Sequence, residues 1–265
     1  MPGSRDRKFS AIHCMNSAVR QRRIRELLES EEFLDLDTLC TRLEISESTA
    51  RRDLATLETQ GVLRRVYGGA MAMQPREHHL DFVWQSEHMT EEKHRIAALA
   101  ASLIEENETV ILDGGSTVAE AARALAGRSL QVITNSLPIA EVFSNARQVE
   151  VTLTGGYLYP RLRCMLGPAC EHMLANVTAD VLVMGIGGVT ASGFSNSNTL
   201  VVAPERKMIE AARKVIVLAD HTKFGRNSVI HLAPLDVADI VVSDTALDPQ
   251  FQELLKSAGV EVLLA

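Results

Sequence analysis

The spacing of apolar residues divides the chain into two regions with different patterns. From about residue 91 to the end, short apolar runs alternate with stretches of helical spacing. The apolar runs, each predicted to be a buried strand, are 110–112, 131–134, 149–153, 181–184, 215–218, 240–242 and 260–263. Predicted helices lie at 90–103 (capped by Thr90), 116–125, 138–143 and about 168–176, 204–213 and 248–257. Apolar strands separated by helices indicate an α/β domain with a mainly parallel sheet covered on both faces.

The first part of the chain follows a mostly helical pattern. Apolar residues at helical spacing predict one helix at 19–28 and a second at 38–43, which Asp37 caps. A tight turn at 44–45 leads to a third predicted helix. Residues 62–70 are typical of a β-hairpin with basic side chains at one edge and a glycine pair at its end. Three helices and a wing in this order indicate a small winged helix-turn-helix domain.

The third helix is the stretch that points most directly to a partner. Ala50, Leu54 and Leu57 form one apolar stripe at positions i, i+4 and i+7. Ser46 is the predicted N-cap, and Gly61 is placed to end the helix. The opposite face is rich in hydroxyls and arginines, which suits the major groove of DNA, where residues near the start of a recognition helix meet base edges.

An ordinary surface helix with solvated arginines is the alternative interpretation of this stretch. The flanking helices and the basic wing favour DNA binding. The predicted DNA-contacting residues are Ser46, Ser48, Thr49, Arg51, Arg52, Arg64 and Arg65.

These patterns predict four segments. They are a disordered tail at 1–16, the DNA-binding domain at 17–71, a linker at 72–90 and an effector-sensing domain at 91–265. The linker is polar and aperiodic and contains the pair His78-His79, which we interpret as solvated rather than as a metal clamp. Trp84 is apolar enough to dock, for instance across a dimer.

Composition excludes several classes of protein. The chain has 265 residues, of which 46% are hydrophobic, enough for two domains, and no apolar run approaches the length of a membrane span. The first residues lack the apolar segment of a secretion signal, so we expect a cytoplasmic protein. The four cysteines, Cys14, Cys40, Cys164 and Cys170, lie at no metal-ligand spacing. We therefore expect reduced thiols and neither a metal nor another cofactor.

The net charge of −7 argues at first against nucleic acid. Its distribution changes that interpretation, because residues 1–74 hold 12 basic and 11 acidic side chains, whereas the remainder holds 15 and 23. A nearly neutral domain binds DNA when its arginines share one face. Its non-specific affinity is limited, because few counterions are released.

Polar and glycine residues gather where the predicted strands end, which is where open α/β sheets bind ligands. The five strand ends are 113–117, 134–136, 154–156, 185–188 and 219–225. Residues 112–117 are typical of a strand, a glycine turn and a helix start, whose free amides suit a phosphate. Each strand end alone is also explained by an ordinary loop, but the five together indicate a ligand site.

Two separate stretches of the small domain resemble a known family. Ser46 to Leu57, followed by Arg65-Val66-Tyr67-Gly68-Gly69-Ala70, is similar to the signature of the DeoR-type family of bacterial transcriptional regulators. The arginine pair, the aspartate and the glycine pair fall at the family's spacing. Ala50 stands where the family usually has a larger β-branched residue, and Tyr67 where histidine is common. These departures concern core packing and the wing.

The strand ends resemble the effector domain of the same family, so the resemblance runs from about Arg20 to the end of the chain. It implies a sensor domain similar to ribose-5-phosphate isomerase and coenzyme A transferase domains, which binds phosphorylated sugars or related metabolites. Implied contacts to the phosphate or its neighbouring hydroxyls are Asp113, Gly114, Gly115, Ser116 and Thr117. Implied contacts to the sugar are Thr134 and Asn135, with Gly155, Gly156 and Gly187 shaping the site and Asp220 and Lys223 closing it.

The resemblance leaves some positions open. The segment 193–198 followed by Glu205-Arg206 is similar to one branch of the family only, so the effector and the roles of Asn196, Asn198, Glu205 and Arg206 are not assigned. The stretch 157–163 is either a lid whose Arg161 and Arg163 touch an anion or a solvated surface turn.

The predicted function is a DNA-binding transcriptional regulator. The expected form is a repressor of a carbohydrate-metabolism operon, whose partners are operator DNA and a phosphorylated sugar or related metabolite. Reading a palindromic or repeated operator requires at least a homodimer, and family members are often tetramers. The alternative is a sugar-phosphate isomerase or transferase with an accessory DNA-binding arm, in which Asp113 and Asp220 shuttle protons. No dedicated catalytic set supports this enzyme interpretation. A third possibility, an RNA-binding module, has little support because the sequence has no clustered exposed aromatics for base stacking.

Overall fold

The computed structural model describes residues 16–30, 33–66, 68–72 and 81–265. The predicted tail before residue 16, Tyr67 and the histidine pair at 78–79 lie outside the described residues. The chain forms two compact units, Met1–His79 and Leu80–Ala265, and the division falls within the stretch expected to be a linker.

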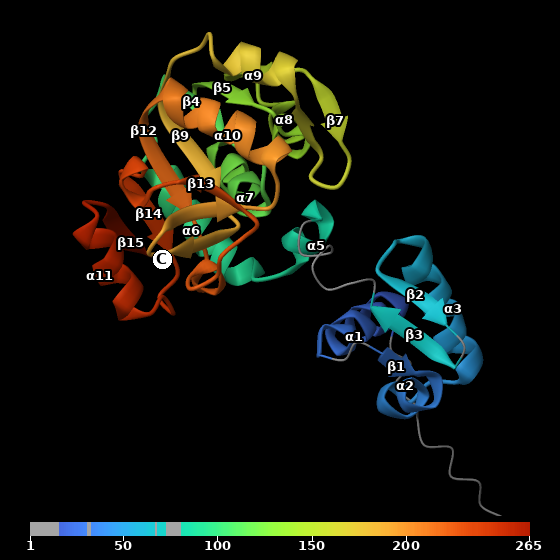
Figure 1. Ribbon diagram of the computed structural model, residues 1–265. Coiled ribbons are helices and arrows are strands. Elements are labelled where there is room, and N and C mark those ends of the chain that lie inside the picture. Colours follow the sequence, from blue (N-terminus) through green and yellow to red (C-terminus); the bar gives the residue numbers. More distant parts are fainter. Residues whose placement is uncertain (1–15, 31–32, 67, 73–80) are drawn as a thin grey trace, which may run out of the picture. The chain divides into compact units, whose positions relative to one another are not determined.

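The first unit is a helix-turn-helix domain with a three-stranded sheet (Figure 1). Its elements are α1 (Ser17–Ser30), β1 (Phe33–Asp35), α2 (Leu36–Leu43), α3 (Glu47–Thr59), β2 (Leu63–Val66) and β3 (Gly69–Ala72). The sheet is antiparallel with the order β1-β3-β2. The apolar stripe predicted for the third helix lies in the core, because Ala50, Leu54 and Leu57 pack against Ile24, Leu39 and Leu63.

Two predicted details of this unit are wrong. Asp35 caps α2 instead of Asp37, and its carboxylate accepts a hydrogen bond from the Thr38 amide at 3.0 Å. The helix starts earlier because β1, which the sequence pattern did not predict, ends at Asp35. The glycine pair does not end the hairpin: Gly68 takes a φ of +83° beside the turn, and Gly69 begins β3. A Cβ atom at Gly69 would lie 2.1 Å from the Leu34 carbonyl oxygen, so β1 passes too close for any side chain.

The second unit is built on a seven-stranded sheet in which every pairing is parallel. The strand order is β15-β14-β12-β9-β4-β5-β6. The strands are β4 (Thr109–Leu112), β5 (Leu130–Thr134), β6 (Val149–Leu153), β9 (Ala179–Gly185), β12 (Ala212–Leu218), β14 (Ile240–Ser243) and β15 (Glu261–Leu264). This confirms the predicted mainly parallel α/β fold. The chain leaves β4 toward β5 on one side and reaches β9 on the other, so the order reverses between β4 and β9.

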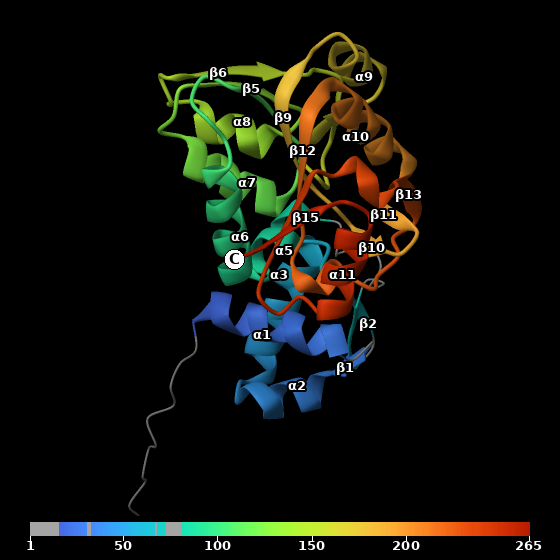
Figure 2. The same cartoon turned by 90° about the vertical axis from the view of Figure 1, so that its left-hand side faces the viewer.

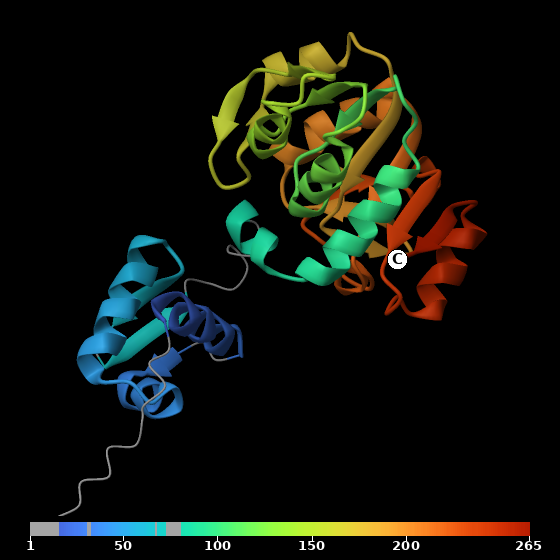
Figure 3. The same cartoon turned by 180° about the vertical axis from the view of Figure 1, so that it is seen from behind.

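Helices cover both faces of this sheet (Figure 2). One face packs against α6 (Thr90–Ser102), α7 (Ser116–Leu125) and α8 (Leu137–Phe143), and the other against α9 (Pro168–Leu174), α10 (Thr199–Ala211) and α11 (Pro249–Ser257). Neighbouring strand residues alternate between the two cores: Val110 and Leu112 belong to the first, and Ile111 to the second. Seen from behind, α6 runs beside α7 on the first face (Figure 3).

Several short elements escaped prediction. They are α5 (Phe82–Glu87), the hairpin β7 (Tyr157–Tyr159) and β8 (Cys164–Leu166), the small antiparallel sheet β10 (Gly188–Thr190), β11 (Gly193–Asn196) and β13 (Ile230–Ala233), and the 3-10 turns η1 (His221–Lys223) and η2 (Leu235–Val237). Helix α5 lies in the stretch expected to be a linker, and Trp84 stacks on His88 within the same chain segment.

Two predicted helix starts also shift. Met89, with a φ of +52°, caps α6, and Thr90 is its first residue. Asn198 caps α10 by accepting from the Val201 amide at 3.1 Å, so this helix begins before Pro204 rather than at it. No helix among the described residues has the length and apolar character that crossing a bilayer requires.

Candidate nucleic-acid interface and candidate effector site

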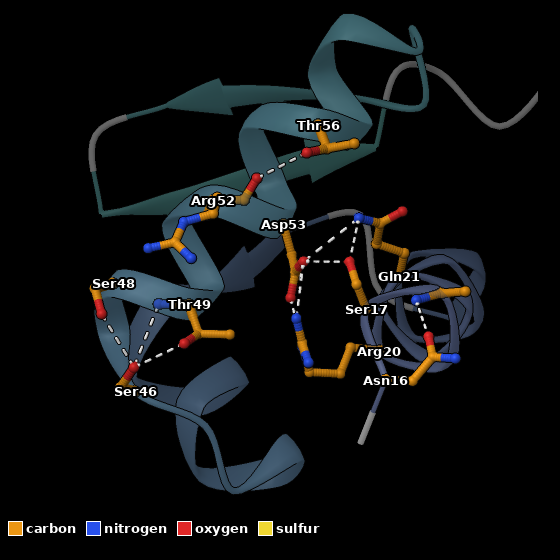
Figure 4. A network of polar contacts seen from close by, with 11 residues as sticks. Asn16, Ser17, Arg20, Gln21, Ser46, Ser48, Thr49, Arg52, Asp53 and Thr56 are labelled. Atoms are coloured by element: carbon orange, nitrogen blue, oxygen red, sulfur yellow. Dashed lines mark hydrogen bonds and ion pairs between the residues drawn. The ribbon is translucent and has the colours of Figure 1, made fainter. Parts of the chain in front are cut away.

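Helix α3 is capped at both ends as its sequence predicts. Ser46 has extended backbone angles, and its hydroxyl accepts from the Thr49 amide at 3.3 Å. The same hydroxyl lies 3.1 Å from Ser48 Oγ and 2.9 Å from Thr49 Oγ1 (Figure 4). At the other end, Gly61 has a φ of +73°, and its amide donates to the Glu58 carbonyl at 2.9 Å. The three hydroxyl residues predicted to meet DNA therefore gather at the start of the helix.

The four predicted DNA-contacting arginines fall into two pairs. Arg51 forms an ion pair with Glu47 at 2.5 Å, and Arg65 forms one with Glu58 at 2.6 Å. Arg52 and Arg64 are exposed, and neither side chain has an ion pair or hydrogen bond among the described residues. Figure 4 shows the Arg52 side chain pointing away from Asp53. Arg52 and Arg64 are therefore available to phosphates directly, whereas Arg51 and Arg65 must first leave a carboxylate.

Asp53 belongs to the motif that carries the family resemblance, but the sequence assigned it no role. Its side chain is buried on the inner face of α3 and accepts a hydrogen bond from Arg20 Nε at 2.7 Å. The helical pattern marks position 53 as lying beside the apolar stripe. Only the structure shows that α1 supplies the cation.

The candidate effector residues lie at the carboxyl ends of the sheet strands. Asp113 follows β4, Asn135 follows β5 and Gly187 lies just beyond β9. Because β4 and β9 are neighbours at the point where strand order reverses, Asp113 sits at the place where open α/β sheets bind ligands. Its buried carboxylate accepts hydrogen bonds from the backbone amides of Gly114 and Gly185.

A second buried acid lies close to Asp113. Glu205, from α10, accepts a hydrogen bond from Asn196 Nδ2. Burial raises the pKa of Asp113 to about 7, and burial together with the charge of Asp113 raises the pKa of Glu205 well above its ordinary value. Among the described residues, Asp113 Oδ2, Asn135 Oδ1 and Glu205 Oε2 are buried oxygens without a hydrogen-bond partner. Such oxygens suit the hydroxyl groups of a ligand.

The hairpin β7–β8 passes directly over this strand end. The Met165 amide donates to the Asn135 carbonyl at 2.7 Å, and the Cys164 thiol packs on Gly114, where a Cβ atom would lie 2.2 Å from Sγ. Gly156, with a φ of +111°, likewise leaves room for the Leu166 carbonyl. Gly114 and Gly156 are therefore required by close packing of the hairpin.

The remaining residues predicted to bind the effector differ in whether their polar groups or backbone are free to meet a ligand. The fully buried Thr134 hydroxyl donates to the Leu112 carbonyl at 2.7 Å and accepts from the Ser136 amide at 3.0 Å, so it joins two strand ends. Gly115, with a φ of +150°, and Gly155, with a φ of +70°, face open space. Ser116 and Thr117 are buried at the start of α7. At Gly187, a Cβ atom would lie 3.1 Å from Asn196 Oδ1.

Asp220 and Lys223 lie together after β12 with a third residue that the sequence did not reveal. The Asp220 carboxylate accepts from the Thr222 amide at 3.0 Å, and burial lowers the pKa of Lys223. Lys93, on α6, is buried and donates from Nζ to the Gln85 carbonyl and, at 2.7 Å, to the His88 carbonyl. Burial lowers the pKa of Lys93 to about 8, and the charges of Asp220 and Lys223 also act on it.

The two arginines of the possible lid are paired with carboxylates. Arg161 contacts Asp81 at 3.0 Å, and Arg163 contacts Glu141 at 3.0 Å. The described residues contain no cluster of three or more histidine, cysteine, aspartate or glutamate residues arranged to hold a metal, and Cys40, Cys164 and Cys170 are free thiols.

A helix-turn-helix with a wing in one unit, and polar residues gathered at the strand ends of the other, are the arrangement of a DNA-binding regulator with a sensor domain. Comparison with known proteins agrees. Residues 20–76 match the DeoR-like helix-turn-helix domain, and residues 88–245 match the DeoR C terminal sensor domain. The chain belongs to the DeoR family of transcriptional regulators, which disfavours the enzyme interpretation.

Two relatives, which match over nearly their whole length, support this assignment. The HTH-type transcriptional repressor GlcR of Bacillus subtilis is 34% identical over 91% of this chain and 93% of its own length. The HTH-type transcriptional regulator GlpR of Haloferax volcanii is 32% identical over 94% of this chain and 98% of its own. Ribose 5 phosphate isomerase A from Neisseria gonorrhoeae aligns with 53% of this chain and 54% of its own, at 19% identity and a TM-score of 0.38.

Proposed function

We propose that this regulator represses a carbohydrate-metabolism operon and that a phosphorylated sugar bound in the second unit controls its affinity for DNA. The observation that carries the proposal is the division of the strand-end site into two chemically different parts. One part holds the unpartnered oxygens of Asp113, Asn135 and Glu205, and the other holds Lys223 and Lys93. Sugar hydroxyls suit the first part, and an anionic group suits the second.

The spacing of the two parts fits one small ligand. Asp113 follows β4 and Lys223 lies after β12, and β9 separates these strands. Neighbouring strands lie about 4.8 Å apart, which places the two ends roughly 10 Å from each other. One end holds the two buried acids Asp113 and Glu205, whereas the other holds the lysines Lys223 and Lys93 beside the single carboxylate of Asp220. We therefore assign the hydroxyl end of the ligand to Asp113 and the phosphate end to Lys223. The family resemblance implies that Asp113 contacts either the phosphate or its neighbouring hydroxyls, and this proposal selects the hydroxyls.

The partners follow from the same proposal. A helix-turn-helix reader of a repeated operator works as at least a dimer, so we propose a homodimer or homotetramer. Its place of action is the cytoplasm, where operator DNA lies. We also propose functional domain limits of 17–71 for DNA binding and 91–265 for effector sensing, with 72–90 connecting them.

Thermal unfolding of the full chain against phosphorylated and unphosphorylated sugars tests the proposed ligand class. A ligand at about 100 times its dissociation constant adds roughly 2.7 kcal/mol to the stability of the folded state. We expect saturable shifts with a phosphorylated sugar, loss of the shift in Lys223→Met, and retention in Lys256→Met, whose lysine is exposed on α11. The same ligand should release operator DNA. Equal shifts with and without the phosphate, or an unaffected Lys223→Met variant, would contradict the proposed phosphate end.

A further inference from the structure

Asp53 is an acid in an unexpected place, because it lies on the recognition helix between an arginine and the apolar stripe. Its side chain is only 4% exposed, whereas Arg51 and Arg52, immediately before it, face solvent. A carboxylate next to a phosphate-binding surface repels DNA unless its charge is neutralised. Burying an ionised carboxylate is also unfavourable unless it is paired and hydrogen-bonded.

Helix α1 supplies these partners. Arg20 donates to both carboxylate oxygens of Asp53, from Nε at 2.7 Å and from Nη2 at 3.3 Å. Ser17 Oγ donates at 3.3 Å and Gln21 Nε2 at 3.4 Å. Ser17, Arg20 and Gln21 are spaced at i, i+3 and i+4, so they project from one face of α1 (Figure 4). One carboxylate thus joins α3 to three successive polar groups of another helix.

This contact fixes the rotation of α3 about its own axis. Apolar packing of Ala50, Leu54 and Leu57 is non-directional, and side chains of similar volume tolerate small rotations. A two-point arginine–carboxylate contact is directional. Successive helix residues are separated by about 100° around the axis, so the direction of Asp53 determines the direction of Arg52 and of Thr49.

We propose that Asp53 is a positioning residue for operator recognition: its buried contact with Arg20 orients α3 so that Arg52 and the hydroxyls at the helix start face the bases. The inference concerns the DNA-binding function that the family assignment shows, and it is independent of the effector. It separates two roles on adjacent residues of one helix, because Arg52 contacts DNA and Asp53 sets where Arg52 points.

The variant Asp53→Asn distinguishes positioning from simple charge. If Asp53 acted only through its charge, its removal would strengthen binding to every DNA. If it positions α3, binding to the operator weakens, while binding to an unrelated duplex is unchanged or stronger. We expect the ratio of operator to non-specific affinity, measured with the full chain and a duplex selected by the wild-type protein, to fall at least tenfold.

A matched control removes an acid of the same unit that has no ion pair or hydrogen bond to α3 among the described residues. Glu26→Gln serves, because Glu26 is an exposed residue of α1 that pairs with Arg22 at 3.3 Å. Its affinity ratio should equal that of the wild type. All titrations are made well below the unfolding midpoint of each variant, so that loss of folded protein does not enter the ratio.

Arg20→Lys provides the second test and decides the matter if Asp53→Asn does not fold. It keeps the positive charge but loses the planar two-point contact. We expect its affinity ratio to fall in the same direction, with little further loss in the double variant Arg20→Lys with Asp53→Asn. An unchanged ratio in a folded single variant, or equal strengthening toward both duplexes, would overturn the proposal.

Discussion

Asp113 shows how one side chain links the fold of the second unit to solution pH. Burial raises its pKa from 3.8 to about 7. The folded state therefore binds this proton more tightly than the unfolded state does. Stability attributable to Asp113 is fully present below pH 3.8 and is lost as the pH rises through 7. At neutral pH the fold opposes ionisation of this buried carboxyl group. A ligand hydroxyl that donates a hydrogen bond to the Asp113 carboxylate would stabilise its ionised form.

Replacing Asp113 with Asn should flatten this dependence. Wild type should lose stability between pH 5 and pH 8 relative to Asp113→Asn by on the order of 2 kcal/mol, because the variant keeps the shape and cannot ionise. The change is smaller than the full shift implies, since the range begins at pH 5, above the ordinary pKa of 3.8 from which the loss of stability accumulates. Urea unfolding at four pH values measures it, with the exposed Asp236→Asn as the control. Parallel curves for wild type and Asp113→Asn would refute the assigned pKa.

At this scale the sequence reveals residues of a motif but not their tertiary partners. Asp113 and Asn135 follow adjacent apolar runs, so their common place at one sheet edge is predictable from the parallel pattern. Glu205 is distant in sequence from Asp113, and Lys93 is distant in sequence from Lys223. Neither the burial of these two side chains nor their spatial neighbours follow from the spacing of residues. Thr134 has the right place, but its hydroxyl is occupied by backbone groups of two strand ends.

At the scale of the element, two neighbouring arginines of α3 differ in how readily they can bind DNA. Arg51 and Arg52 are indistinguishable by composition. Arg51 is held by Glu47, whereas the Arg52 side chain has no ion pair among the described residues. A phosphate that recruits Arg51 must displace a carboxylate, so part of the binding energy is offset.

Arg52→Ala should therefore weaken operator binding more than Arg51→Ala. We expect a loss of at least tenfold for Arg52→Ala and a smaller one for Arg51→Ala, because Arg51 must break its ion pair with Glu47 before it can bind DNA. A base contact by Arg52, as proposed above, should leave the slope of log affinity against log salt nearly unchanged, whereas loss of a phosphate contact would lower it by about 1. Operator titrations at several salt concentrations give both quantities, and Arg213→Ala, in the second unit, is the control. A larger effect of Arg51→Ala would show that its ion pair is released on binding.

The elements that escaped prediction share a physical cause. Strand β1 has three residues and depends on its pairing with β3, and α5 has six, fewer than two turns. Such elements are too short for a periodic pattern and are held by partners distant in sequence: the Phe82 amide donates to the Arg161 carbonyl at 2.9 Å. The ten-residue helix α7 and the apolar strand β6 have clear patterns of their own and were predicted to the residue.

At the scale of the whole molecule, the two units differ in charge as well as in fold. The first 74 residues carry almost no net charge, and the acidic excess lies in the rest of the chain. A near-neutral reader gains little from counterion release, so its affinity depends on oriented contacts such as those of α3. DNA affinity is therefore sensitive to small changes in the orientation of the DNA-binding unit on DNA. A regulator controlled by a metabolite depends on such sensitivity.

Control by a metabolite carries a thermodynamic condition that the full chain must meet. If the effector lowers operator affinity by some factor, bound operator must lower effector affinity by the same factor. We expect a factor between about 5 and 150, the usual range of such coupling. Calorimetric titration of effector into the free protein and into the operator complex measures one side of the cycle. Operator titration with and without saturating effector measures the other.

The variants described above assign any failure of this condition to one unit. Lys223→Met should retain wild-type operator affinity without effector and show no coupling, because only its sensor site is changed. Arg52→Ala should bind the effector normally, because the sensor unit is intact. An effector that binds with full affinity yet leaves operator affinity unchanged would show that the strand-end site does not control DNA binding. Equal reductions in affinity on the two sides would establish that one equilibrium, biased from two sites, governs the regulator.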